Sequence, residues 1–406
     1  MNFDLNKIIE KFKYDPNSVK KNYDGKTDIY LAKVSYRYAY FKRIICLILI
    51  LVIAFFLISG NLSYEKMFYL TKDIKLANDY VNSVHDTITY NAGNSQVFAA
   101  YRGGLAVASR ERFSIFSAGG RELISSNHSY GNPKLEVSNK YVLLYDIGGK
   151  QFSLYNSFTK IKEEKLDYSI YGADMSRNGD FALITKSEKY DSVVKVYKQN
   201  GTTYSYSFSE GRVCALSLSE NGSHLALLLT HSNGSEMKTE IRLYDVGKDD
   251  YKSESISFSG VPYGVSILDG GSIFVVGARG VNVFSSNLNR TGEYLSDSEI
   301  YLYSFGEDNI AIADLSGAGG KTRVLLLNKR CNAEKEYQLE ERLIDINIYG
   351  NSLFLQELAG FDRIDLRSGK TYSMDIIANE FKMIPIDKDT LVICNESFAK
   401  FIELKK

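Results

Sequence analysis

The chain has 406 residues, and its 49 Lys and Arg residues balance its 49 Asp and Glu residues, so the formal net charge is zero. Charged residues make up 24% and apolar residues 44% of the sequence, which excludes an intrinsically disordered chain. The lack of a basic excess argues against a dedicated nucleic-acid-binding protein. With 30 Tyr, 22 Phe and 31 Gly, but only 4 Pro and no Trp, the composition favours strands joined by short turns over helical bundles.

The charge is distributed unevenly around an uncharged run. Residues 1–43 contain ten basic and five acidic residues, a net charge of +5, and the other 39 basic and 44 acidic residues give residues 44–406 a net charge of −5. The nineteen residues 44–62, IICLILILVIAFFLISGNL, would reach about 28 Å as a helix, close to the hydrocarbon thickness of a bilayer. A transmembrane helix is therefore predicted at 44–62. A buried core helix would normally carry some polar positions, and a cleaved signal peptide would be shorter and start earlier.

The residues that flank this run predict its orientation. Four basic residues lie within about a dozen residues before it: Lys33, Arg37, Lys42 and Arg43. The basic residues that follow it are mixed with acidic ones, so the positive-inside rule places the N-terminus in the cytoplasm. The predicted layout is a short basic cytoplasmic tail (1–43), the transmembrane helix (44–62), a linker (63–80) and an extracytoplasmic domain (81–406).

A repeat of about forty residues runs from residue 96 onward. Each unit has a short strand, a tight Gly/Asn/Asp turn, an apolar strand, a charged loop and an alternating strand that ends in an aromatic residue; the clearest copies are 176–208 and 219–258. The predicted apolar strands are Leu105–Ser109, Tyr141–Tyr145, Phe181–Thr185, Leu225–Thr230, Ile273–Ala278, Ile310–Asp314, Leu353–Glu357 and Leu391–Asn395. Alternation with a period of two, together with NG and GG turns, indicates strands rather than helical repeats.

A four-stranded unit of this length has the size of one blade of a β-propeller. Eight units are counted, so the predicted fold is all-β: an eight-bladed β-propeller preceded by one transmembrane helix, with a seven-bladed propeller as the alternative. The last unit stops after its third strand, whereas the alternating segment 84–90 (VHDTITY) has no blade of its own. We predict that this segment completes the last blade and closes the ring.

The segment GADMSRNGDFALITKSEKYDSVVKVYKQNG (172–201) resembles the repeat of an uncharacterised bacterial family of membrane-anchored β-propeller proteins with PQQ-like or WD-like repeats. The resemblance covers about residues 30–406, and its motifs are structural. It implies a propeller that follows one membrane span. It implies no known activity, and it supplies no functional residue.

Signals for catalysis are few. None of the four His residues has HExxH spacing, and no GxSxG motif is present. The stretch GAGGKT (317–322) lacks the first Gly of a phosphate-binding loop, because Leu315 stands there. Cys214 and Cys394 lie in apolar runs and are predicted to be small buried side chains. No catalytic residue, metal or cofactor is predicted.

The candidate binding residues come from the loops between the second and third strands of the blades. In a propeller these loops open on one face, which is usually the binding face, although polar hairpin tips can also be merely solvated. The candidates are Arg110, Arg112, Lys186, Tyr190, His231, Glu236, Lys238, Arg279, Asp314 and Lys321. A long loop at 230–240 makes His231, Glu236 and Lys238 the best candidates for a protruding contact.

The predicted function is a membrane-tethered, extracytoplasmic binding scaffold without catalytic activity, for a protein or a cell-envelope partner. The predicted location is the cell membrane, crossed once by 44–62, with the C-terminal domain outside and no nucleic acid bound. Two alternatives remain open. One is an extracellular enzyme or cofactor-dependent oxidoreductase that uses the central funnel, and the other is a single-span sensor that signals to the cytoplasmic tail.

Overall fold

The computed structural model describes residues 41–51, 87–90, 96–233, 236–315, 321–375, 382–386 and 390–404. The chain divides into two units, residues 1–75 and 76–406. In the first unit, residues 41–51 form a helix whose apolar side chains are exposed.

Within the described ranges, no helix combines the length and the apolar character that a membrane crossing requires. The predicted transmembrane helix at 44–62 is therefore not supported by the structure. Its first part coincides with the helix over 41–51, and residues 52–62 lie outside the described residues. The predicted linker 63–80 and residues 1–40 of the predicted tail lie outside them as well.

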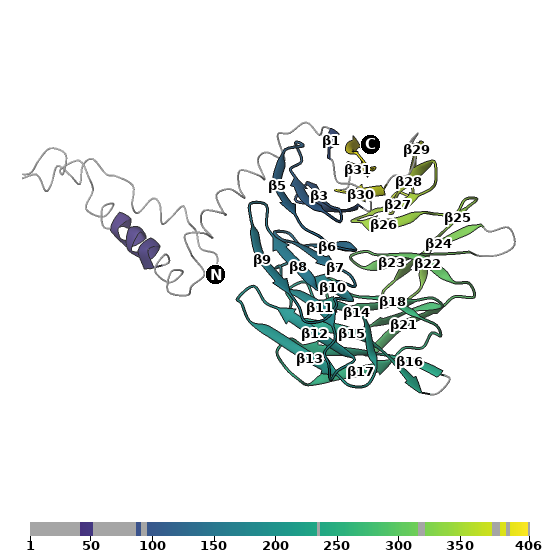
Figure 1. The fold of residues 1–406 in the computed structure, drawn as a ribbon. Helices are drawn as coiled ribbons and strands as arrows, with labels where there is room; N and C mark the ends of the chain where they lie inside the picture. The colour runs from purple at the N-terminus through teal and green to yellow at the C-terminus, as the bar shows by residue number, and fades with distance from the viewer. Residues whose placement is uncertain are drawn as a thin grey trace, which may run out of the picture. The chain divides into compact units, whose positions relative to one another are not determined.

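The second unit is an all-β propeller of eight four-stranded antiparallel sheets, each of which is one blade (Figure 1). The count confirms the eight-bladed prediction over the seven-bladed alternative. Blades 1 to 4 consist of β2 (Val97–Tyr101), β3 (Gly104–Ala108), β4 (Arg112–Phe116) and β5 (Glu122–Asn127); β6 (Pro133–Val137), β7 (Val142–Asp146), β8 (Gln151–Tyr155) and β9 (Lys160–Lys165); β10 (Gly172–Met175), β11 (Phe181–Thr185), β12 (Ser192–Tyr197) and β13 (Thr203–Phe208); β14 (Arg212–Leu218), β15 (His224–Asn233), β16 (Glu236–Asp245) and β17 (Tyr251–Ser255). Blades 5 to 8 consist of β18 (Pro262–Ile267), β19 (Ile273–Gly277), β20 (Gly280–Phe284) and β21 (Arg290–Leu295); β22 (Ile300–Phe305), β23 (Asn309–Leu315), β24 (Thr322–Asn328) and β25 (Ala333–Leu339); β26 (Asp345–Tyr349), β27 (Ser352–Gln356), β28 (Gly360–Asp365) and β29 (Thr371–Asp375); β30 (Lys382–Pro385), β31 (Thr390–Cys394), β32 (Phe398–Glu403) and β1 (Thr87–Thr89).

The first strand of each blade lies nearest the ring axis. First strands of neighbouring blades contact one another, and β30 of the last blade contacts β2 of the first, which closes the circle. The fourth strands lie at the periphery, as the labels β5, β9, β13 and β25 show in Figure 1. Their side chains are correspondingly exposed, as in β17, where all five residues are exposed.

The blades pack on each other through the alternating side chains of their strands. In β15, Leu225, Leu227 and Leu229 face blade 3, whereas Ala226 and Leu228 face blade 5, and all five are fully buried. Each buried Leu contributes about 1.5–3 kcal/mol relative to an exposed one. One strand therefore stabilises two interfaces.

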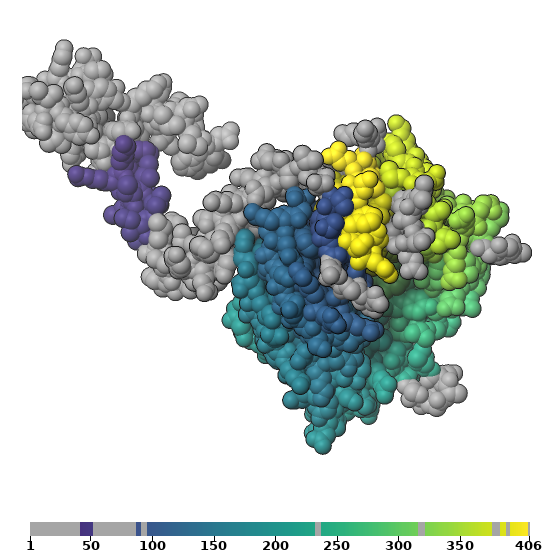
Figure 2. Space-filling model, turned by 45° about the horizontal axis from the view of Figure 1, so that its top comes forward, coloured from purple at the N-terminus to yellow at the C-terminus, as the bar shows by residue number. Residues whose placement is uncertain are grey.

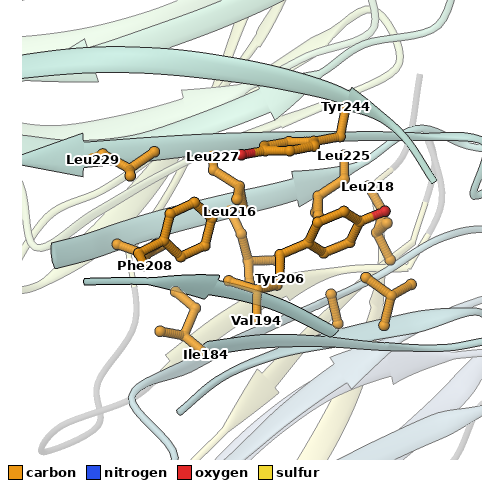
Figure 3. Close-up of a cluster of buried hydrophobic side chains, with 13 residues drawn as sticks. Ile184, Val194, Tyr206, Phe208, Leu216, Leu218, Leu225, Leu227, Leu229 and Tyr244 are labelled. Atoms are coloured by element: carbon orange, nitrogen blue, oxygen red, sulfur yellow. The ribbon is translucent and has the colours of Figure 1, made fainter. Parts of the chain in front are cut away.

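The interface between blades 3 and 4 appears in Figure 3, with these labelled side chains: Ile184, Val194, Tyr206, Phe208, Leu216, Leu218, Leu225, Leu227, Leu229 and Tyr244. Among the described residues there are eight such buried clusters, one for each pair of neighbouring blades. The core of this domain is therefore a ring of interfaces rather than one central cluster.

The ring is closed by a strand from the N-terminal side of the propeller. β1 pairs antiparallel with β32 and forms the outer strand of blade 8, which confirms the prediction for residues 87–90 of the segment 84–90; residues 84–86 lie outside the described residues. Figure 2 shows this N-terminal segment beside the yellow C-terminal strands. The hydroxyl of Tyr90 lies 2.7 Å from the carbonyl of Asn395 and 2.8 Å from that of Phe398.

Candidate functional site

The turns between second and third strands lie at one end of the ring, together with the connections between blades. In a meander of four antiparallel strands, both must leave from the same edge. Hydrogen bonds join the two kinds of loop: the Tyr130 amide donates to the Arg110 carbonyl at 2.9 Å, and the Ser296 amide donates to the Arg279 carbonyl at 3.0 Å. We call this end of the propeller the loop face.

Exposed apolar side chains gather on the loop face. They are Tyr171, Met237, Val261, Leu315, Ile344 and Leu358. The other large exposed apolar side chains in the described part of the propeller belong to outer strands (Ile161, Tyr251, Leu295 and Met374) or to the opposite face (Tyr349). Apolar surface concentrated on one face is typical of an interaction site.

Three of these side chains occupy the same place in different blades. Tyr171, Val261 and Ile344 each immediately precede the first strand of a blade, at β10, β18 and β26. They are 51%, 56% and 47% exposed, respectively. Because first strands lie nearest the ring axis, these three positions surround the centre of the loop face. We call them the inner apolar residues.

In blade 4 the equivalent position is Gly211, and the imidazole of His231 lies against it. A Cβ atom on Gly211 would stand only 2.5 Å from Cε1 of His231, and the φ angle of Gly211 is +83°. His231 is held there by Glu240, whose Oε1 lies 3.2 Å from its Nε2. Glu240 in turn accepts a hydrogen bond from Arg242. The side chain of His231 therefore lies close to the ring axis, at the base of its hairpin.

The predicted long loop at 230–240 is instead an extension of two paired strands. β15 and β16 remain in register as far as Asn233 and Glu236. The neighbouring strand β14 stops pairing at Thr230, and β17 stops at Glu240, so the two-stranded tip projects beyond its sheet (Figure 1). Lys238 and Met237 are exposed on this tip. The side chain of Glu236 is not among those described.

Four further candidates lie on the loop face of blades 1, 3 and 5. Arg110 and Lys186 are exposed. The amide of Tyr190 donates to Oγ of Ser187 at 3.0 Å, which fixes the tight turn between β11 and β12. Arg279 is exposed, and its guanidinium donates to the carbonyl of Asp297 at 2.6 Å.

The remaining three candidates are engaged in contacts within the fold. Asp314 is only 1% exposed, and its carboxylate lies 2.6 Å from Nη2 of Arg323, so this predicted contact residue is an internal counterion. Arg112 pairs with Glu122 at 2.9 Å and lines a cavity of about 90 Å³ beside β1. Lys321 is exposed and pairs with Glu340 at 2.7 Å.

The candidates are therefore spread over five blades. In the described part of the chain, their polar contacts stay within their own blade or reach the adjoining connection, and they form no compact constellation. Among the same residues, no group of three or more His, Cys, Asp and Glu side chains has the geometry of a metal site. The candidate site is thus a face of the propeller rather than a catalytic cleft.

Residues 78–404 match the model of a family of unknown function, DUF5711. The chain belongs to this family. Comparison with curated protein sequences finds no match.

Among solved structures, BamB from Moraxella catarrhalis is similar, with a TM-score of 0.52, 12% identity, and coverage of 79% of this chain and 99% of BamB. Chaetomium thermophilum Sqt1, solved bound to the N-terminus of the ribosomal protein L10, has a TM-score of 0.57, 12% identity and the same two coverages. At such identities the likeness concerns the fold alone.

In this DUF5711 chain, the inner apolar residues are not among the candidates predicted from the sequence. Those candidates lie in the polar turns between second and third strands, whereas Tyr171, Val261 and Ile344 lie at the ends of the blade-to-blade connections. Each of the three is an apolar residue directly before a first strand, but no bounds were predicted for the first strands from the sequence. Period-2 alternation alone does not reveal whether such a residue is buried or exposed, because it lies outside the strand.

Proposed function

We propose that this DUF5711 propeller is a binding scaffold that engages a protein or cell-envelope partner on its loop face, without catalysing a reaction. The observation that carries the proposal is that the three inner apolar residues are exposed at equivalent positions of three blades around the ring axis. Burying apolar surface is favourable in free energy, and the three half-exposed side chains leave part of theirs in water. A partner that covers them would remove this surface from water and so bind more tightly. Interface cores are enriched in such side chains, Tyr in particular.

The fold supports this proposal. A propeller presents many independent loops on a rigid ring, so contact residues can be placed without disturbing the core. Sqt1 was solved with a terminal segment of another protein bound, which shows that a propeller of similar fold can hold a protein partner. By analogy of fold, a protein segment is the occupant that we propose for the loop face.

We further propose that residues 44–62 tether the propeller to a membrane, with the N-terminus in the cytoplasm and the propeller outside. The support is the uncharged run, the division of charge into +5 and −5, and the exposed apolar side chains of the helix over 41–51. Alkaline extraction of membranes from cells that make the full chain tests the anchor, and protease treatment of intact cells tests the orientation. Release by alkali, or a propeller protected from external protease, would contradict the respective part.

The loop-face proposal is tested by affinity capture with the full chain from its own membranes. The variant Tyr171→Ser/Val261→Ser/Ile344→Ser removes the inner apolar residues. The control Ile161→Ser/Tyr251→Ser removes two comparably exposed apolar side chains from the outer strands β9 and β17, at the ends that lie away from the loop face. We expect the triple variant to lose a partner that both the wild type and the control retain. Equal recovery with all three proteins would refute the proposal.

A further inference from the structure

The most exposed large apolar side chain of the described propeller lies on blade 7. Leu358, in the turn between β27 and β28, is 75% exposed, and Ile344, at the start of β26, is 47% exposed. Their segments are joined directly, because the amide of Ile344 donates to the carbonyl of Gln356 at 2.8 Å. Two exposed aliphatic side chains thus lie on adjoining segments of the loop face.

The segment that carries Ile344 is fixed at several points. The amide of Leu343 donates to the hydroxyl of Tyr301 at 3.3 Å, and the guanidinium of Arg342 lies over the ring of Tyr301 at 4.9 Å. Glu340, two residues before Arg342 in the chain, forms an ion pair with Lys321. These contacts hold the segment around Ile344 in one conformation. A ligand would therefore bind a preorganised surface, without the cost of ordering this segment.

Three carboxylates lie on the same segments of blade 7 or on the adjoining strand β28. Glu341 precedes Ile344 by three residues, Glu357 adjoins Leu358, and Asp362 lies on β28. Burial, followed by the charges of Asp362 and Glu341, raises the pKa of Glu357 above its usual value, so the charge of Glu357 is repelled by each of the other two carboxylates. Within the described ranges, none of the three forms an ion pair. The basic side chains Lys321 and Arg342 are already engaged, with Glu340 and Tyr301.

We propose that this surface, which we call the blade 7 patch (Glu341, Ile344, Glu357, Leu358 and Asp362), binds an extended segment of a partner protein in which aliphatic side chains alternate with Lys or Arg. The aliphatic side chains cover Ile344 and Leu358, and the cations relieve the repulsion among the carboxylates. An anionic membrane surface or a nucleic acid has the wrong charge for this patch. The inference rests on the proposed function, because it names the chemistry of the partner on the same face.

The test uses the full chain in a non-ionic detergent and fluorescence anisotropy with labelled peptides. The probe is KLKLK, and the comparison peptides are ELELE, which reverses the charge, and KSKSK, which removes the aliphatic side chains. Empty micelles correct for adsorption of the peptides. We expect KLKLK to bind at least about tenfold more tightly than either comparison peptide, and its affinity to fall as NaCl is raised.

Variants locate the binding. Leu358→Ser should weaken KLKLK about tenfold, since it removes the largest apolar contact. Glu341→Gln/Glu357→Gln should weaken it severalfold and flatten the salt dependence. Leu295→Ser, an equally simple change at an exposed Leu of β21, should bind like the wild type. Thermal unfolding midpoints within a few degrees of the wild type establish that the variants are folded.

Two results would overturn the inference: equal binding of ELELE and KLKLK, or wild-type affinity in the Leu358→Ser and the double Gln variants. Either result would leave the proposed function intact if the variant lacking the inner apolar residues still loses its captured partner. Failure of that capture experiment, by contrast, would refute the proposed function whatever the peptides do.

Discussion

Ile88 of β1 lies opposite Ala399 of β32, and through this pair the N-terminal side of the propeller completes the blade built by its C-terminal strands. Ile88 is buried in the same cluster as Leu105 and Val107 of blade 1. The last blade-to-blade interface therefore needs both ends of the domain. The rigidity of the loop face depends on this closure, because an open ring would let the inner strands of blades 1 and 8 separate.

The first prediction concerns the closure. Ile88→Ala should lower the free energy of unfolding by about 2–5 kcal/mol, since it leaves a cavity in the closing interface. Thr89→Ala, on the exposed side of the same strand, should change it by less than about 0.5 kcal/mol. Urea unfolding of the full chain in detergent measures both. Equal stability of the two variants would show that β1 does not hold the ring closed.

The second prediction assigns Asp314 a structural role. Arg323→Met should destabilise the fold by about 3–5 kcal/mol, because it leaves the carboxylate of Asp314 buried without its counterion. Lys321→Met breaks an exposed pair at the start of the same strand and should cost about 0–1 kcal/mol. The same unfolding measurement compares them. A loss of similar size in both variants would contradict the internal role of Asp314.

The third prediction separates the two reasons why Gly211 must be Gly. Gly211→Ala introduces a Cβ into the imidazole of His231 at a φ of +83°. Gly201→Ala introduces one at a similar φ of +88°, with nothing within 4 Å. The second variant should therefore show only the backbone cost, about 1 kcal/mol, and the first should lose clearly more. Equal losses would mean that His231 does not pack on Gly211.

The fourth prediction is a pH dependence. Burial, followed by the charge of Asp174, raises the pKa of Glu136 to about 8. A carboxyl in the unfolded chain titrates near about 4.3, so between these values the folded protein binds more protons and stability falls as the pH rises. Glu136→Gln cannot lose a proton. The unfolding temperature of Glu136→Gln minus that of the wild type should therefore increase from about pH 4.5 to about pH 8. Above that range the difference should stay constant.

A second variant checks the cause of this shift. Asp174→Asn removes the neighbouring charge, so the pH at which the wild-type curve stops falling should move lower. Parallel curves of unfolding temperature against pH for wild type and Glu136→Gln would show that Glu136 titrates at an ordinary value in the folded protein.

The architecture could be predicted from the sequence because a strand that is buried on both faces has to alternate its contacts between two neighbours. The predicted strand Phe181–Thr185 coincides with β11, and the closing segment was found because one blade lacked a strand. The membrane span and its orientation remain predictions, since residues 52–62 lie outside the described residues.

The site could be predicted only in part, because exposure depends on local geometry that alternation does not encode. Cys214 was expected to be buried, yet a register shift between Val213 and Ala215 leaves it exposed. Asp314 follows an apolar run, which is the position where a loop residue is expected. In the structure it is buried, because its carboxylate forms an ion pair with Arg323 on the facing strand. That the turns between second and third strands share one face follows from topology, whereas the apolar residues of that face became visible only in three dimensions.

The central claim, that a partner sits on the loop face, is tested most directly by photo-crosslinking in the native membrane. The photoreactive residue p-benzoylphenylalanine replaces Tyr171 on the loop face in one full-length variant. In the other it replaces Tyr349, which has similar exposure at the opposite end of a first strand. We predict a discrete crosslinked partner from position 171 and none from position 349. A partner crosslinked from position 349, with none from position 171, would contradict the account.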